Sequence, residues 1–154
     1  MLSAGSSKLV SYFVETAQKE ETKGQYFYAA QEFGNEIFFG SDHGRVWRYQ
    51  KKDGQFVLLQ LPASSRIVEI KKIDEQDILI VTETDGFFVY NVPSQGWEHY
   101  KASRLPKAAV RSVHIDRHSE IWFEQEVPGT VAHFNTKTKV LKTEVVPVEP
   151  TSTD

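Results

Sequence analysis

The sequence contains a threefold internal repeat with a period of 42 residues. Acidic residues that end a short apolar run recur at this spacing, at Glu32, Asp74 and Asp116. Apolar residues that open the next run keep the same spacing, at Ile37, Leu79 and Ile121. Glycines follow the same order at Gly44, Gly86 and, one residue late, Gly129. A period of this length predicts three copies of one supersecondary structure.

Each unit has the pattern of a four-stranded antiparallel meander. Short β-branched and aromatic runs alternate with turn sequences such as Glu83–Gly86 and Pro93–Gly96, which is typical of β-hairpins. The predicted strands are 26–31, 36–40, 45–50 and 55–61 in the first unit, 66–74, 77–82, 86–90 and 97–100 in the second, and 109–115, 120–124, 130–135 and 140–145 in the third. Four strands in each period match the size of a propeller blade.

The sequence therefore predicts an all-β, β-propeller-like fold of about three four-stranded antiparallel blades in an incomplete ring, because propellers typically have about four to eight blades. The expected blades are residues 25–62, 66–103 and 108–146. Residues 1–24 precede them, and residues 8–22 fit either an amphipathic helix or the outer strand of another blade. Residues 147–154 are expected to form a linker or tail.

Composition and the lack of known motifs argue against several classes of partner, cofactor and chemistry. The 18 basic and 21 acidic residues give a net charge of −3, which argues against nucleic acid as a partner. No apolar run approaches the roughly 20 residues needed to cross a bilayer, so no membrane span is expected in this chain. With no cysteine there can be no disulfide or thiolate nucleophile. No phosphate-loop, dinucleotide or zinc-helix motif is present, so no cofactor is expected.

Two stretches, residues 34–49 and 110–123, resemble the propeller repeats of bacterial two-component regulators. They read Gly-Asn-Glu-Ile-Phe-Phe-Gly-Ser-Asp-His-Gly-Arg-Val-Trp-Arg-Tyr and Val-Arg-Ser-Val-His-Ile-Asp-Arg-His-Ser-Glu-Ile-Trp-Phe. The resemblance covers about residues 26–145 and departs from the pattern at three positions: Ile80, where it prefers Trp, and Thr82 and Glu124, where it has the turn glycine found at Gly40.

This resemblance implies a sensor propeller of the kind that hybrid histidine kinases carry, often for saccharides outside the cytoplasm. A periplasmic or extracellular location follows by the same resemblance, although the first seven residues lack the basic and apolar regions of a secretory signal. With three blades, the chain is expected to be a fragment, an arc that other chains complete, or a compact repeat variant.

Three acidic residues are expected in equivalent loops between the second and third strands, at Asp42, Asp85 and Glu126. In a propeller these loops gather on one face, so the carboxylates could bind a cation or sugar hydroxyls. The alternative is turn chemistry, because an Asp beside a turn glycine favours a tight turn without any ligand. None has the spacing of a calcium loop, so no metal site is expected.

Three further residues join the candidate ligand-binding set. Trp47 stands between Arg45 and Arg48, which indicates a surface position from which its ring could stack on a sugar. Arg66 is expected in a loop on the same face as the acidic residues, where it could bind a ligand carboxylate or simply be solvated. His43 belongs to the same loop as the first of those acids.

The remaining histidines and Trp122 have ordinary structural interpretations. His114 and His118 are four residues apart but bracket a strand end and a turn, so they do not share a helical face as metal ligands would. Trp122 lies within an apolar strand and is expected to pack inside its blade.

An acidic, strand-rich chain without catalytic motifs favours binding over catalysis. The leading interpretation is a ligand-sensing propeller segment with a small-molecule or saccharide ligand. The alternative is a protein–protein scaffold whose blades complete a ring with other domains or subunits, because open blade edges expose unpaired backbone groups and make an oligomer possible. An enzyme of the lyase or glycosidase kind rests on fold analogy alone.

Overall fold

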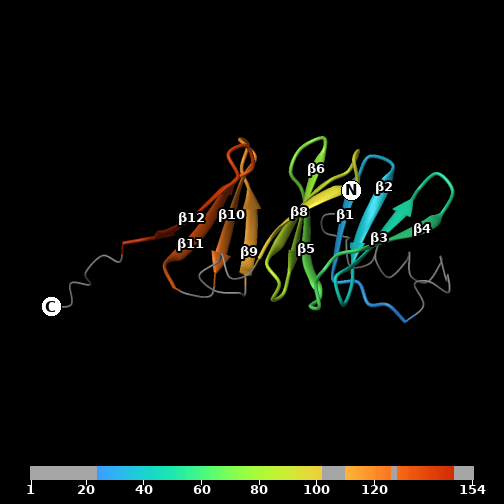
Figure 1. The fold of residues 1–154 in the computed structure, drawn as a ribbon, viewed down its shortest axis with the longest axis horizontal. Coiled ribbons are helices and arrows are strands. Elements are labelled where there is room, and N and C mark those ends of the chain that lie inside the picture. The colour runs from blue at the N-terminus through green and yellow to red at the C-terminus, as the bar shows by residue number, and fades with distance from the viewer. Residues whose placement is uncertain (1–23, 102–109, 126–127, 148–154) are drawn as a thin grey trace. The chain divides into compact units, whose positions relative to one another are not determined.

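The structure is a computed structural model, and it describes residues 24–101, 110–125 and 128–147. The described residues form twelve β-strands in three four-stranded antiparallel sheets (Figure 1). The first sheet has the order β1 (Ala29–Phe33), β2 (Glu36–Gly40), β3 (Arg45–Gln50) and β4 (Gln55–Gln60). The second has the order β5 (Ile67–Lys72), β6 (Asp77–Thr82), β7 (Phe87–Asn91) and β8 (Gly96–Tyr100). The third has the order β9 (Val110–Ile115), β10 (Glu120–Gln125), β11 (Thr130–Asn135) and β12 (Val140–Val145).

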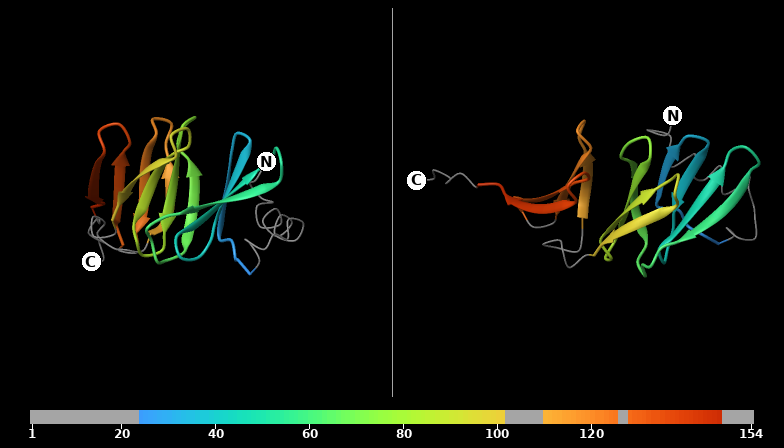
Figure 2. Two further views of the ribbon diagram at one scale, coloured as in Figure 1. Left: turned by 45° about the vertical axis from the view of Figure 1, so that its right-hand side comes forward. Right: turned by 45° about the horizontal axis from the view of Figure 1, so that its top comes forward.

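The predicted fold class is confirmed, since each repeat forms one sheet whose strands follow chain order (Figure 2). Several strand bounds differ from their predictions by one or two residues. The largest difference is at β1, which begins at Ala29 rather than at residue 26. The Ser41 hydroxyl donates a 2.8 Å hydrogen bond to the Tyr26 carbonyl, so a side chain takes the place of the strand ladder there. The expectations for residues 1–23 and 148–154 fall on segments outside the described residues. In the described ranges, no helix is long and apolar enough to cross a membrane.

The turns explain why the strands end where they do. Asp74 Oδ1 accepts hydrogen bonds from the backbone N–H groups of Gln76 and Asp77, both at 2.8 Å. Asp116 Oδ1 does the same for His118 at 2.8 Å and Glu120 at 3.0 Å. Such side-chain bonds offer the backbone an alternative to the ladder. The repeated acidic residues of the second and third units are therefore turn-forming residues.

The chain divides into two compact units, residues 1–100 and 101–154. In the first unit, an apolar core joins the first sheet to the second. Phe38 of β2 meets Tyr90 of β7 edge-on, with the ring centroids 6.0 Å apart. Gly40 makes a close approach possible, because a Cβ built there would lie 2.5 Å from Cγ2 of Ile67. The absence of a side chain thus lets β2 and β5 pack together.

The second unit holds the third sheet, whose two faces differ. One face is apolar and buried, with Ile121, Phe123, Ala132 and Phe134 at most 1% exposed. The other face carries Glu120, Trp122, His133 and Asn135, which are all partly exposed. Side chains alternate between the two faces along β10 and β11. The polar face holds the pocket described below.

Candidate functional site

The loops that follow β2 and β6 lie at one edge of the first unit, together with the loop that precedes β5. Backbone hydrogen bonds of 2.9 Å join them: Gly44 N–H donates to the Ser65 carbonyl, and Glu83 N–H donates to the Arg66 carbonyl. The structure thus brings Asp42, Arg66 and Asp85 to one edge. Glu126, the third acidic residue of the predicted set, lies outside the described residues.

Tyr28 links Asp42 to Arg66 at this edge. Its hydroxyl donates to the Asp42 carboxylate at 3.1 and 3.2 Å. The Arg66 guanidinium lies over the Tyr28 ring, 5.0 Å from its centroid, and pairs with Glu83 at 3.2 Å. Both predicted residues therefore have protein partners. His43 is exposed in the same loop, where its φ of 57° places it in the left-handed region.

Asp85 is held by the loop before β5. Its Oδ2 accepts hydrogen bonds from the Ser65 hydroxyl at 2.6 Å and from the backbone N–H groups of Ser65 and Ser64 at 2.9 and 3.2 Å. The Ser65 hydroxyl, followed by the two backbone donors, holds the pKa of Asp85 below its ordinary value although partial burial opposes this. The carboxylate thus fastens one loop to another.

The predicted surface position of Trp47 is wrong. Its side chain is only 6% exposed and packs in a cluster with Ile37 and Phe39. Trp47 stands opposite Phe39 across β2 and β3, so both side chains project from the same face of the sheet. The neighbouring Arg48 projects from the opposite face, as alternation along a strand requires. Trp47 is therefore not available for stacking on a sugar.

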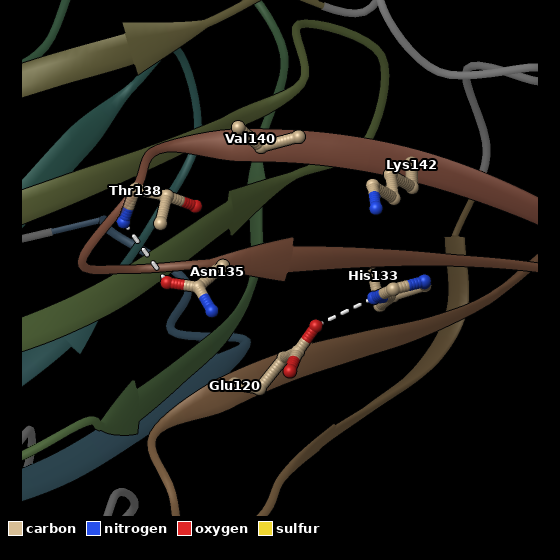
Figure 3. Close-up of a pocket in the computed structure, with 6 residues that line it drawn as sticks. All are labelled: Glu120, His133, Asn135, Thr138, Val140 and Lys142. Atoms are coloured by element: carbon tan, nitrogen blue, oxygen red, sulfur yellow. Dashed lines mark hydrogen bonds and ion pairs between the residues drawn. The ribbon is translucent and has the colours of Figure 1, made fainter.

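A pocket of about 430 Å³ lies on the polar face of the third sheet (Figure 3). It is lined by Glu120, His133, Asn135, Thr138, Val140 and Lys142. Asn135 Oδ1 accepts hydrogen bonds from the backbone N–H groups of Lys137 and Thr138, both at 2.9 Å. These two bonds orient the side-chain amide nitrogen of Asn135. The Lys142 side chain forms no hydrogen bond or ion pair with the described residues. The pocket thus offers an amide and an ammonium group as donors.

His133 lies between two carboxylates in this pocket. Its Nδ1 is 2.5 Å from Oε2 of Glu120, and the two side chains point toward one another in Figure 3. Its Nε2 is 3.0 Å from Oε2 of Glu144. Burial acts to lower the pKa of His133, but the bonds to the two carboxylates outweigh it and raise that pKa above its ordinary value.

Trp122 covers one face of the His133 ring. The two rings are stacked at 17° with centroids 4.4 Å apart. The Trp122 indole N–H donates a 3.0 Å hydrogen bond to Asp116 Oδ2, and this bond is the largest cause of the lowered pKa of Asp116. Trp122 thus lies partly exposed on the polar face rather than among the buried apolar residues of the sheet, and it supports the histidine of the pocket.

Equivalent positions of the three sheets carry different side chains on this face. The acid that opens the second strand faces an amide on the third strand in every sheet: Glu36 and Gln50, Asp77 and Asn91, Glu120 and Asn135. The next same-face pairs along these strands are Phe38 and Arg48, Leu79 and Val89, Trp122 and His133. The acid binds Arg48 in the first sheet, Asn91 in the second and His133 in the third.

Sequence reasoning missed His133 and Glu120 as site residues. The acid at the start of the second strand was a usable signal, since it recurs at Glu36, Asp77 and Glu120. Its pairing with a histidine 13 residues later depends on the hairpin register, which no local pattern predicts. In the described ranges, no cluster of three or more His, Asp or Glu side chains is arranged to hold a metal ion.

No protein-family model matches the sequence, and no curated protein is detectably similar to it. Solved structures do resemble it. The β-propeller domain of Cps50 (Swd1) from Myceliophteria thermophila matches with a TM-score of 0.67 and 12% identity, over 88% of this chain and 46% of that one. The fold is that of β-propeller blades.

Two further solved structures are similar to this chain. The extracellular domain of a candidate one-component system from B. thetaiotaomicron has a TM-score of 0.63 and 14% identity, over 80% of this chain and 18% of that one. Virginiamycin B lyase from Staphylococcus aureus has a TM-score of 0.65 and 16% identity, over 80% of this chain and 42% of that one. This chain spans less than half of each of these three structures, and at such identities the likeness shows the fold alone.

Proposed function

We propose that this chain is a ligand-binding segment of a sensor-type β-propeller and that the third-sheet pocket takes a small polyhydroxylated ligand such as a monosaccharide. The observation that carries the proposal is the chemistry of the pocket face. Glu144 stands at the position of Leu59 and Tyr100 in the other sheets. Glu124 stands at the position of Gly40 and of Val81, since the strand register aligns Val81, not Thr82, with that glycine. Both glutamates are exposed.

This face differs from a packing face. Phe38 and Leu79 are fully buried at the position of Trp122, whereas the third sheet surrounds Trp122 with charged residues. Burying these charges under another sheet would carry a desolvation cost even where they are paired. The face therefore favours contact with water and polar ligands over contact with an apolar sheet.

The pocket chemistry suits a neutral ligand with many hydroxyl groups. Donors are present at Asn135 and Lys142, and the Glu120 carboxylate is an acceptor. With His133 protonated, its charge and that of Lys142 balance Glu120 and Glu144. Sugar hydroxyls both donate and accept hydrogen bonds, and the volume of about 430 Å³ lies within the range for small-molecule sites. The extracellular domain of a candidate one-component system among the similar structures supports a sensing role and an extracellular or periplasmic location.

The test is a binding screen of the chain against neutral monosaccharides and disaccharides, read by chemical-shift perturbation. We expect shifts confined to residues 116–145, and we expect Asn135→Ala and Lys142→Ala to weaken binding at least about fivefold. Asn91→Ala, at the equivalent position of the second sheet, is the matched control and should bind normally. Absence of binding across the panel, or equal binding by all variants, would refute the proposal.

A second candidate function, association with other protein chains, is favoured by one observation. Strand β4 lies at the edge of the first sheet and exposes Val57 and Leu58 to 44% and 43%, one on each face. Edge strands with exposed apolar residues tend to pair with other chains. Light scattering of the chain and of Leu58→Lys tests this function, which predicts an oligomer that the lysine substitution dissociates.

The loop edge with Asp42, His43, Arg66 and Asp85 is a further place where a ligand or partner could bind.

A further inference from the structure

Both ring nitrogens of His133 lie within hydrogen-bond distance of carboxylate oxygens. Both neighbours, Glu120 on β10 and Glu144 on β12, present carboxylate oxygens, which accept hydrogen bonds. A neutral imidazole has a single N–H and can donate to only one of them, whereas an imidazolium donates to both. We propose that His133 is a proton-dependent clamp that ties three strands together and holds the pocket in its binding shape.

The consequence for binding rests on the function proposed above. Loss of the proton releases one carboxylate and leaves the two glutamates facing a neutral ring. The wall of the pocket then loses one cross-strand contact and gains net negative charge. A ligand that needs the ordered wall binds more weakly in that state, because part of its binding free energy is spent on ordering the wall again.

The charged and titratable groups around the ring favour the protonated form. Glu120 approaches from β10 and Glu144 from β12, while Lys142, opposite His133 on β12, adds a single positive charge. Beyond Trp122 lie the Asp116 carboxylate and, opposite Trp122 on β9, the exposed His114. The π face of Trp122 against the ring adds a favourable contact for a cation.

The first sheet contains the permanently charged counterpart of this clamp. Arg48 occupies the position of His133 there and binds Glu36 through Nε at 2.7 Å and Nη2 at 3.0 Å. An arginine keeps its charge throughout the physiological pH range. Replacing His133 by arginine in the third sheet therefore keeps a cation between the carboxylates and removes the titration.

The direction of the pH effect follows from the raised pKa of His133. The contribution of the clamp to stability is complete below the pKa of an unfolded histidine, about 6.5, and is lost as the pH rises through the folded-state pKa. We therefore expect the third sheet to be more stable at pH 6 than at pH 9 and the pocket to bind more tightly at the lower pH.

The first experiment needs no ligand. In the full chain labelled with ¹⁵N, both ring nitrogens of His133 should be protonated at pH 6, and Glu144→Gln should move the titration midpoint to lower pH. The melting temperature of the third sheet should fall by about 4 °C or more between pH 6 and pH 9, and the dependence should be smaller in His133→Arg. His118→Asn, which changes an exposed turn histidine, is the control and should retain the full dependence. A singly protonated ring at pH 6, or an unchanged pH dependence in His133→Arg, would overturn the clamp.

The second experiment uses the tightest-binding saccharide from the screen. Its affinity should fall about fivefold between pH 6 and pH 9 in the natural chain and stay nearly constant in His133→Arg. Equal loss in both proteins would overturn the regulation. Failure of every saccharide to bind would instead refute the proposed function, while the ring titration and the melting series would still decide the clamp.

Discussion

Glu36 and Arg48 form a two-point ion pair across β2 and β3, with oxygen–nitrogen distances of 2.7 and 3.0 Å. The Arg48 side chain is only 10% exposed, so its charge depends on this partner. The exposed pair of Glu32 and Lys51, near the same end of the sheet, has ready access to water at both side chains. The two pairs allow a comparison of buried and exposed charges within one sheet.

Glu36→Gln should destabilise the first unit by about 1–3 kcal/mol, because it leaves the Arg48 charge poorly compensated in a mostly buried place. Glu32→Gln should cost less than about 1 kcal/mol, because exposed ion pairs contribute little. Urea unfolding of both variants measures the difference. Equal losses would show that the Glu36–Arg48 pair is no more important than a surface contact.

Gly40→Ala should destabilise the first unit by about 1–3 kcal/mol through overpacking. The added methyl group would lie 2.5 and 2.6 Å from two branched side-chain atoms of Ile67, so the two sheets must move apart. Gly96→Ala is the matched strand control, because its nearest new contact is Ser94 Oγ at 3.5 Å. Thermal unfolding should show a clear loss for the first variant and a small change for the second.

Asp85→Asn should destabilise the first unit by about 1 kcal/mol or more at pH 7, because it weakens three hydrogen bonds to Ser64 and Ser65. The lowered pKa of Asp85 gives the pH dependence its sign. The stabilisation is present above the unfolded value, about 3.9, and is lost as the pH falls through the folded-state pKa. Denaturant unfolding at pH 7 and pH 2.5 measures this, and Asp53→Asn in an exposed turn is the control. A loss at pH 2.5 as large as that at pH 7 would contradict the electrostatic explanation.

Tyr90→Phe should leave the stability unchanged or raise it by up to about 1 kcal/mol. The Tyr90 hydroxyl is buried and has no hydrogen-bond partner among the described residues, so removing it relieves an unfavourable desolvation. Burial raises the pKa of this hydroxyl, although the nearby Arg48 opposes the shift. A marked destabilisation in thermal unfolding would mean that the hydroxyl is bonded in solution, for example through a buried water.

The repeat and the turn residues predicted the strands well because both depend on local sequence. The alternation of apolar residues and the Asp-Gly punctuation act over a few residues, and the predicted β2, β3, β6, β11 and β12 have the observed bounds. The interpretation of Trp47 failed for a related reason. Its arginine neighbours suggested a surface position, but Arg48 projects from the opposite face of β3 and Arg45 lies at the first position of the strand.

The sequence by itself determined that this protein is built from three four-stranded antiparallel sheets, since hydrophobic period and turn chemistry are carried by residues close together in the chain. The tertiary structure alone decided which side chains meet. Hairpin register brought His133 between Glu120 and Glu144, and the packing of one sheet on another buried Phe38 against Tyr90. Contacts of this kind join residues from separate strands, and a shift of one residue in register would turn each side chain to the opposite face.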